Sequence, residues 1–242
     1  MSIERSIKED EFKTKIKDEI ASFQLILSEN LPFAIPHFLD RLSTLEIVFT
    51  ANIEGKYDIE YYTIQDLNRL IVSVPLSLMA KEYEIIPEFK EKLYYELLVM
   101  SSTYISDKKR VKGFSVYQDY GLGNIGVILN KAYTELLTKR FFKCTNKKPK
   151  DNKDKKYYNR AMTIATKVED FIGKEEMERA YFAGDYEYII ERFNAEGIDG
   201  VSFMKYMYGF RILEDDEFFE EVLNNISVSK KGKVKAKKYN KQ

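Results

Sequence analysis

The stretch from Thr63 to Ser106 constrains the fold most, because its apolar pattern predicts two long helices in succession. In the first, apolar residues recur at three- and four-residue steps at Leu67, Leu70, Ile71, Val74 and Leu78. In the second, which starts at Pro87, the same steps separate Phe89, Leu93, Leu97, Met100 and Tyr104. This spacing places one apolar stripe on each helix, and such a stripe must be buried. We therefore expect the two helices to anchor a helical core.

Helical patterns also precede this stretch. Ser6 and Glu9 form a capping box ahead of an apolar stripe that runs from Phe12 to Leu27. A second helix is expected from Pro36 to near residue 52, because its leucines recur at three-residue steps. The N-terminal part of the chain therefore contains the elements of a helical bundle.

The remaining sequence predicts a long helix after Asn124 and several shorter ones. The shorter helices are expected at 157–172, 174–183, 185–195, 202–212 and 215–223. Alternation typical of a strand occurs only near 110–120 in the first half, which predicts at most a small β-hairpin or loop arm there. The expected class is all-α, a bundle of about nine to ten helices in two subregions.

A basic segment separates the two subregions. Residues 139–156 hold nine Lys or Arg against two Asp and lack apolar periodicity, as linkers do. The expected organisation is an N-terminal helical bundle (1–142), a basic linker (143–156), a smaller C-terminal helical region (157–226) and a Lys-rich tail (227–242).

A net charge of zero conceals an uneven distribution of charge. Residues 230–242 contain seven Lys and no acid, and removing these from the 39 basic residues leaves the body with an excess of seven acids. An acidic body with a basic tail predicts that the tail meets an acidic partner, either nucleic acid or an acidic surface on another subunit.

Several classes of protein are disfavoured by the sequence. No apolar run reaches the roughly 18–20 residues that a membrane span needs, and the charged start does not resemble a signal peptide. A single cysteine, Cys144, rules out an internal disulfide and fits a reducing compartment. The expected location is the cytoplasm or a virion, without a membrane partner.

The segment Gly121–Gly126 has the form G-x-G-x-x-G and opens a helix. In dinucleotide-binding folds such glycines let the backbone approach a pyrophosphate, but that site needs a buried strand before the motif and a second strand after it. Polar, turn-like residues precede this motif, and the Lys-rich segment follows its helix. A turn with Asn124 as the helix cap is therefore favoured, and such a turn can also serve as a contact loop.

Other signals of chemistry are weak. His37 is the only histidine, so neither a Cys–His pair with Cys144 nor a multi-His metal site is expected. The acidic run Glu214–Glu217 begins a helix, where acids stabilise the helix dipole, and metal binding is the less favoured interpretation. No catalytic residue, cofactor or metal site is expected.

The segment Ala180–Gly197 resembles one helical hairpin of the tetratricopeptide kind, with Ala-Gly-Asp-Tyr at its turn. The pattern does not recur at the interval of about 34 residues that the repeat requires. A single helical hairpin is therefore expected.

The favoured hypothesis is a non-enzymatic assembly or adaptor protein that binds other protein subunits. Abundant Lys, Ile, Tyr, Asn and Phe point to a low-GC genome, so a phage structural component such as a head–tail connector or ring is its specific form. Eighteen tyrosines suit a protein with extensive contacts. The expected partner contacts are Phe114, Tyr117, Tyr120, Leu122, Lys230, Lys231, Lys233, Lys235, Lys237, Lys238 and Tyr239.

The alternative is an accessory protein of a phage, plasmid or low-GC bacterium that binds nucleic acid. Lysines near phosphates give salt-dependent binding without base recognition. The tail lysines would take part, together with Lys147, Lys148, Lys150 and Lys153. A metal-dependent enzyme is the third hypothesis.

Overall fold

The chain is represented by a computed structural model, which describes residues 3–52, 60–64, 68–75, 87–106, 109–118, 124–143, 152–208, 215–217, 219–224 and 226. It divides into two compact units. The first unit comprises Met1–Ser101 and Leu137–Lys147, and the second comprises Ser102–Leu136 and Lys148–Gln242. This division differs from the expected boundary at 143–156, because residues 102–136 belong with the C-terminal half.

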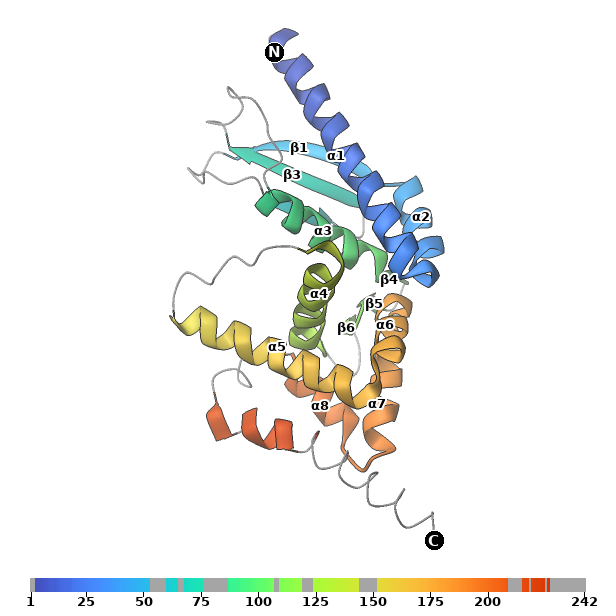
Figure 1. The fold of residues 1–242 in the computed structure, drawn as a ribbon, viewed down its shortest axis with the longest axis vertical. Coiled ribbons are helices and arrows are strands. Elements are labelled where there is room, and N and C mark those ends of the chain that lie inside the picture. Colours follow the sequence, from blue (N-terminus) through green and yellow to red (C-terminus); the bar gives the residue numbers. More distant parts are fainter. Residues whose placement is uncertain are drawn as a thin grey trace. The chain divides into compact units, whose positions relative to one another are not determined.

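Helices hold most of the regular structure, which confirms the expected multi-helix, mainly α class (Figure 1). They are α1 (Ile3–Asn30), η1 (Pro32–Ala34), α2 (Ile35–Ser43), α3 (Pro87–Ser101), α4 (Val127–Phe142), α5 (Asn152–Ile172), α6 (Lys174–Ala183), α7 (Tyr186–Asn194) and α8 (Gly200–Tyr206). Residues 216, 217, 219–224 and 226 are also helical and form what we call the terminal helical segment.

A three-stranded sheet in the first unit corrects two sequence-based expectations. Its strands are β1 (Glu46–Asn52), β2 (Glu60–Ile64) and β3 (Arg69–Pro75), in the order β1-β3-β2. β3 pairs in parallel with β1 and antiparallel with β2. The helix expected after Thr63 is therefore wrong over β3, and the helix expected from Pro36 ends at Ser43 rather than near residue 52.

The sequence of β3 explains this result. The run Leu70–Val74 is rich in β-branched residues, and Leu70, Ile71 and Val72 are all buried. A short apolar run buried on both faces fits a strand as well as a helix, and β-branched side chains favour the strand. Pro75 stands at the last position of the strand.

The core of the first unit forms around the apolar stripe of α1, which is buried as expected from Phe12 to Leu27. The Phe23 ring lies 5.2 Å from that of Phe38 on α2 and 5.6 Å from that of Tyr94 on α3. It also stacks on Phe142, at the end of α4, with the centroids 5.0 Å apart. Truncating a buried Phe to Ala costs about 3–5 kcal/mol, so this cluster contributes strongly to stability.

The second unit contains an antiparallel sheet of β4 (Thr103–Ile105), β5 (Lys109–Lys112) and β6 (Ser115–Gln118), in sequential order. The β5–β6 pair confirms the small hairpin expected near 110–120. Tyr104, expected on the helix before it, lies instead in β4, because α3 ends at Ser101.

The α6–α7 pair forms the expected helical hairpin. Gly184 adopts a left-handed conformation at the turn, with φ of +63°, and the Asp185 carboxylate accepts a hydrogen bond from the Tyr188 N–H at 3.0 Å. A Cβ on Gly184 would lie 2.7 Å from the Tyr104 ring. The turn is therefore seated closely against the first strand of the sheet.

Candidate protein-binding pocket in the second unit

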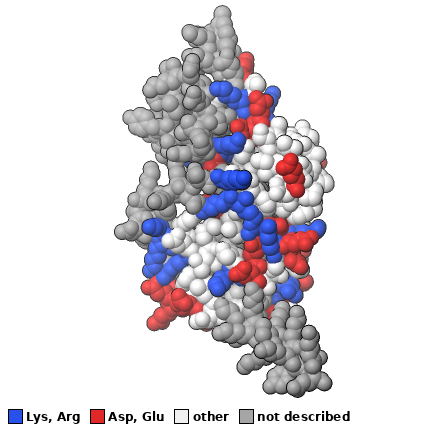
Figure 2. Space-filling view, in the orientation of Figure 1, with Lys and Arg blue, Asp and Glu red and all other residues white. Residues whose placement is uncertain are grey.

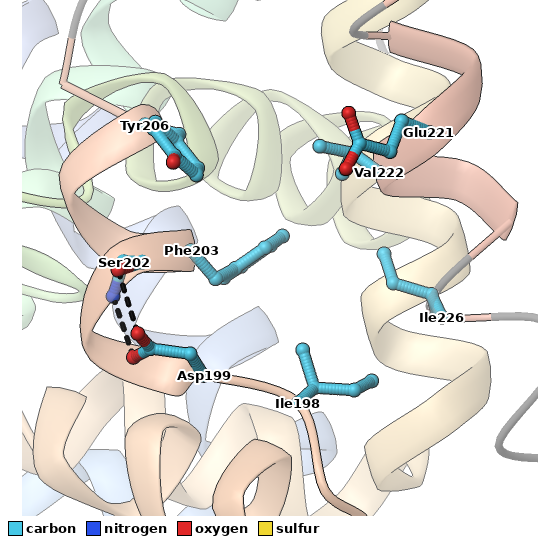
Figure 3. Close-up of a pocket in the computed structure, with 8 residues that line it drawn as sticks. All are labelled: Ile198, Asp199, Ser202, Phe203, Tyr206, Glu221, Val222 and Ile226. Atoms are coloured by element: carbon cyan, nitrogen blue, oxygen red, sulfur yellow. Dashed lines mark hydrogen bonds between the residues drawn. The ribbon is translucent and has the colours of Figure 1, made fainter.

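A pocket of about 320 Å³ lies between α8, with the residues just before it, and the terminal helical segment (Figure 3). We call it the α8 pocket. It is lined by Ile198, Asp199, Ser202, Phe203, Tyr206, Glu221, Val222 and Ile226.

The near wall of the pocket is fixed by the cap of α8. Asp199 accepts hydrogen bonds from the Ser202 N–H at 3.0 Å and from the Ser202 hydroxyl at 2.7 Å (Figure 3). These bonds hold the pKa of Asp199 below its ordinary value, so the carboxylate stays ionised at neutral pH. The cap thus also places a permanent negative charge at the pocket.

Gly200 lets α8 begin directly against α7. A Cβ at this position would lie 2.4 Å from the Ile190 carbonyl oxygen, and the Gly200 N–H donates to the Asn194 Oδ1 at 2.9 Å. The start of α8, and with it the carboxylate of Asp199, is therefore positioned by close approach to the α7 backbone and by the Asn194 side chain.

The floor of the pocket is apolar and rigid. The Phe203 ring stacks on Phe193 of α7 with the centroids 4.4 Å apart, and Phe193 stacks on Phe171 of α5 at 5.0 Å. Val222 and Ile226 are buried on the opposite side. Close packing on this aromatic column holds Phe203 in place, so the floor is formed before anything binds.

The far wall is attached to α5 by charge. The Arg160 guanidinium lies over the Phe219 ring, 4.7 Å from its centroid, and also pairs with Asp216. Lys156 pairs with the same carboxylate at 2.9 Å. Asp216, which sequence reasoning considered for a metal site, therefore acts in ion pairs that hold the terminal helical segment in place.

The rim combines an aromatic ring with two carboxylates. Tyr206 is 50% exposed, and Glu221 faces α8 across the opening (Figure 3). A long side chain with an apolar stem and a cationic tip suits such a site, because the stem can cover the floor while the tip meets a carboxylate. The pocket therefore has the shape and charge that suit a Lys or Arg side chain.

These residues were missed by sequence reasoning as a site. Asp199 and Ser202, three positions apart, form a recognisable cap signal, and Phe203 with Tyr206 share one face of a short helix. The neighbouring acids Glu220 and Glu221 were considered, like the run Glu214–Glu217, as a weak metal site or as helix-starting acids, and not as part of a pocket.

The expected contact residues are distributed differently. Phe114 is wholly buried, with its ring 5.4 Å from that of Tyr133 and 5.5 Å from that of Tyr181. The expectation that Phe114 contacts a partner is therefore wrong, because its side chain belongs to the core. Tyr117 is half-buried, with the Lys112 amine 5.5 Å from its ring centroid, and its contact role stays a prediction.

The other predicted contact residues fall outside the described residues. These are Tyr120, Leu122, the tail from Lys230 to Tyr239, and Lys147, Lys148 and Lys150. Lys153 lies in the first turn of α5, but its side chain is not among those described. Cys144 is also outside them, and His37 is half-buried on α2.

The end of the glycine motif has a structural role. Gly126 has φ of +71°, and its N–H donates to the Met204 carbonyl at 2.9 Å. The Ile128 N–H, in the first turn of α4, donates to the Met207 carbonyl at 2.7 Å. Carbonyl groups from the end of α8 thus occupy N–H groups that a nucleotide phosphate would use, which supports a turn over a nucleotide site. Asn124 is not the helix cap that was expected, because α4 begins only at Val127.

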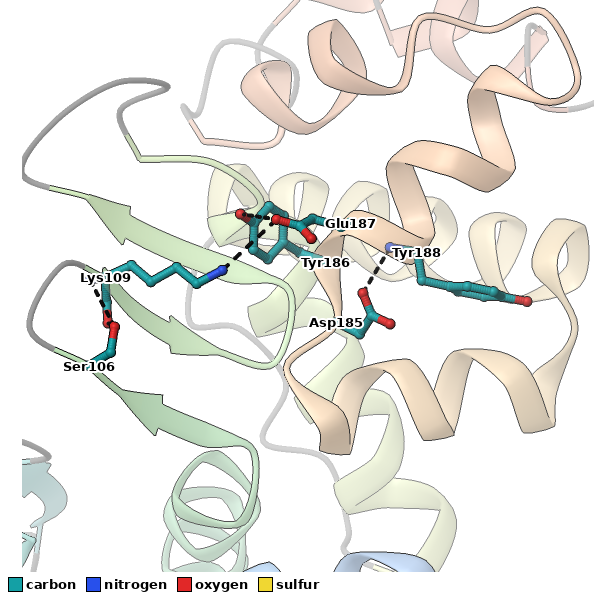
Figure 4. Close-up of polar contacts among 6 residues, drawn as sticks. All are labelled: Ser106, Lys109, Asp185, Tyr186, Glu187 and Tyr188. Atoms are coloured by element: carbon teal, nitrogen blue, oxygen red, sulfur yellow. Dashed lines mark hydrogen bonds and ion pairs between the residues drawn. The ribbon is translucent and has the colours of Figure 1, made fainter.

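A second polar cluster lies where β5 meets the start of α7 (Figure 4). Tyr186 donates a hydrogen bond to Glu187 at 3.0 Å, and the Lys109 amine lies 5.3 Å from the Tyr186 ring centroid and 3.9 Å from Glu187. Burial, together with Glu187, raises the pKa of Tyr186 to about 12. The cluster joins the sheet to the helical hairpin.

Within the described ranges, no three His, Cys, Asp or Glu side chains gather in an arrangement suited to a metal ion. In the same ranges, no helix has the length and apolar character to cross a membrane.

Comparison of the chain with protein-family models, with curated proteins and with solved structures finds no match.

Proposed function

We propose that this protein is a non-catalytic assembly or adaptor protein that binds a protein segment through the α8 pocket. The observation that carries the proposal is the rigid floor around Phe203, which lies beneath a half-exposed Tyr206. Aromatic residues over a preformed apolar pocket are typical of the positions that contribute most to protein binding.

The size of the pocket supports this class of ligand. Its volume of about 320 Å³ is at the lower end of the range for small-molecule sites. It suits one or two side chains of a bound segment. A structural component of a phage particle, such as a connector or ring, is the specific form that the composition favours.

Light scattering after size exclusion tests the proposal by measuring the absolute mass at several concentrations. We expect a defined oligomer that Glu221→Arg weakens, because the substitution reverses a charge at the rim. Glu217→Arg is the matched control, since Glu217 is exposed on the same terminal helical segment but does not line the pocket. A 28.5 kDa particle at every concentration would overturn self-assembly.

Binding to nucleic acid is the second candidate, favoured by the seven Lys in residues 230–242. Figure 2 shows basic and acidic side chains next to one another on the face that it draws, and the tail is the most strongly basic stretch of the sequence. This candidate requires affinity for generic DNA that falls steeply between 50 and 200 mM salt, by roughly 10³-fold for about six phosphate contacts, and that disappears on deletion of 229–242.

A further inference from the structure

We propose that the occupant of the α8 pocket is the Lys-rich tail of the chain itself, residues 227–242. This inference rests on the proposed function and names the segment that the pocket binds. Three features of the second unit carry it: the charge of the rim, the shape of the floor and the position at which the tail begins.

The rim carries charge opposite to that of the tail. Asp199 and Glu221 are both exposed, and they approach the pocket from different segments of the chain. Residues 230–242 carry seven positive charges and no acid. A lysine in the pocket is attracted by both negative charges, whereas a neutral segment gains no such attraction and an acidic one is repelled.

The floor suits the stem of a lysine. Phe203 and Val222 present apolar surface below the carboxylates, and Tyr206 adds a half-exposed ring. Four methylene groups of a lysine can lie on that surface while the amine reaches the rim, and the aromatic rings attract the cation. Shape and charge therefore select the same side chain.

The tail begins at the pocket. Ile226 lines it, and the next residue is the first of the tail. Lys230 follows Ile226 by four residues, which span at most roughly 14 Å when extended. The tail lysines are thus held near the carboxylates at an effective concentration in the millimolar range, which favours them over cations on other proteins.

Zero-length carbodiimide cross-linking of the full chain tests this inference, because the reagent joins a lysine only to a carboxylate that touches it. Cross-linked peptides are identified by mass spectrometry at 50 and 500 mM salt. We expect the tail lysines to be joined mainly to Glu221 and Asp199, with a yield that falls at high salt.

Matched variants make the result specific. Glu221→Gln should reduce the cross-links between the tail and the pocket several-fold, whereas Glu217→Gln should leave them unchanged. Cross-links spread evenly over other exposed acids, such as Glu175 and Glu191, would overturn the inference. An unchanged pattern in Glu221→Gln, with no loss at Asp199, would overturn it as well.

An equal mixture of ¹⁴N- and ¹⁵N-labelled protein separates this inference from the proposed assembly. Mixed-isotope peptides show that the tail binds in the pocket of another copy, and single-isotope peptides show that it binds its own. A monomer with cross-links from its tail to its own pocket supports the inference while overturning self-assembly. An oligomer without such cross-links overturns the inference alone.

Discussion

The hydroxyl of Thr134 lies 2.7 Å from the phenol oxygen of Tyr181, and both side chains are completely buried in the core of the second unit. The Thr134 hydroxyl donates its proton to the Asn130 carbonyl at 2.8 Å, so the Tyr181 phenol is the donor between the two side chains. This pair connects α4 to α6.

The Thr134–Tyr181 hydrogen bond gives a first prediction. Thr134→Val removes the hydrogen bond that the buried Tyr181 phenol makes to Thr134 and should lower the free energy of unfolding by about 1–3 kcal/mol. Tyr181→Phe removes the donor and should cost less, about 0.5–1.5 kcal/mol, because Thr134 keeps its bond to Asn130. Urea unfolding of both variants and of the double variant measures the coupling, and losses that simply add would contradict it.

Gly126 and Gly197 give a second prediction. Both adopt positive φ, but a Cβ on Gly126 would lie 2.1 Å from the Phe114 carbonyl oxygen, whereas a Cβ on Gly197 meets nothing within 4 Å. Gly197→Ala should cost about 1–2 kcal/mol for the left-handed backbone alone. Gly126→Ala should cost about 3 kcal/mol or more, because backbone must also move. If thermal unfolding shows that Gly126→Ala and Gly197→Ala lose the same stability, the close contact at Gly126 is relieved without cost.

Tyr186 gives a third prediction, on pH. Because burial raises its pKa to about 12 in the folded protein, from an ordinary 10.0, the folded state favours the protonated phenol. The resulting stability is complete below pH 10 and is lost as the pH rises through 12. The free energy of unfolding should therefore fall more steeply between these values in the parent protein than in Tyr186→Phe. Parallel curves for the two proteins would contradict the assigned pKa.

Asp199 gives a fourth prediction, which separates its role as the N-cap of α8 from its role in binding the tail. Its pKa is lowered by the bonds from Ser202, so its stabilising effect is present above the ordinary pKa of 3.8 and is lost as the pH falls through the lower folded value. Asp199→Ala should lower the melting temperature at pH 7, and this difference should vanish in strong acid.

Asp199→Asn is the control for that experiment. Asparagine also caps helices well, so this variant should melt close to the parent protein. It removes the charge, however, and should weaken cross-linking between the tail and Glu221. If Asp199→Asn has a lower melting temperature than the parent protein and keeps its cross-links, Asp199 acts only as a cap.

The elements that were predicted correctly are those whose signals are local. The α1 stripe follows from spacing alone, because α1 begins at Ile3 and the capping box predicted at Ser6 and Glu9 is therefore wrong. The α6–α7 hairpin follows from spacing and from a cap that lies within one segment of the chain. The error at β3 arose because its apolar run satisfies helical spacing over a few residues. What decides in favour of the strand is its parallel pairing with β1, from Glu46↔Arg69 to Asn52↔Pro75, which no local pattern records.

The α8 pocket was missed for the same reason. Phe203 and Val222 each lie on a predictable apolar helix face, but their facing positions depend on how Arg160 holds Phe219 and Asp216. Periodicity indicates which side of a helix is buried, and it does not indicate which two sides meet.

The division of the chain into units has a consequence for synthesis. The first unit takes its final segment from residues 137–147, and the chain between its two segments, residues 102–136, belongs to the second unit. Domains tend to fold as they leave the ribosome, from the N-terminus onward. Here the first unit has all its residues only after residues 102–136 have emerged, so part of the second unit is already synthesised when the first is completed.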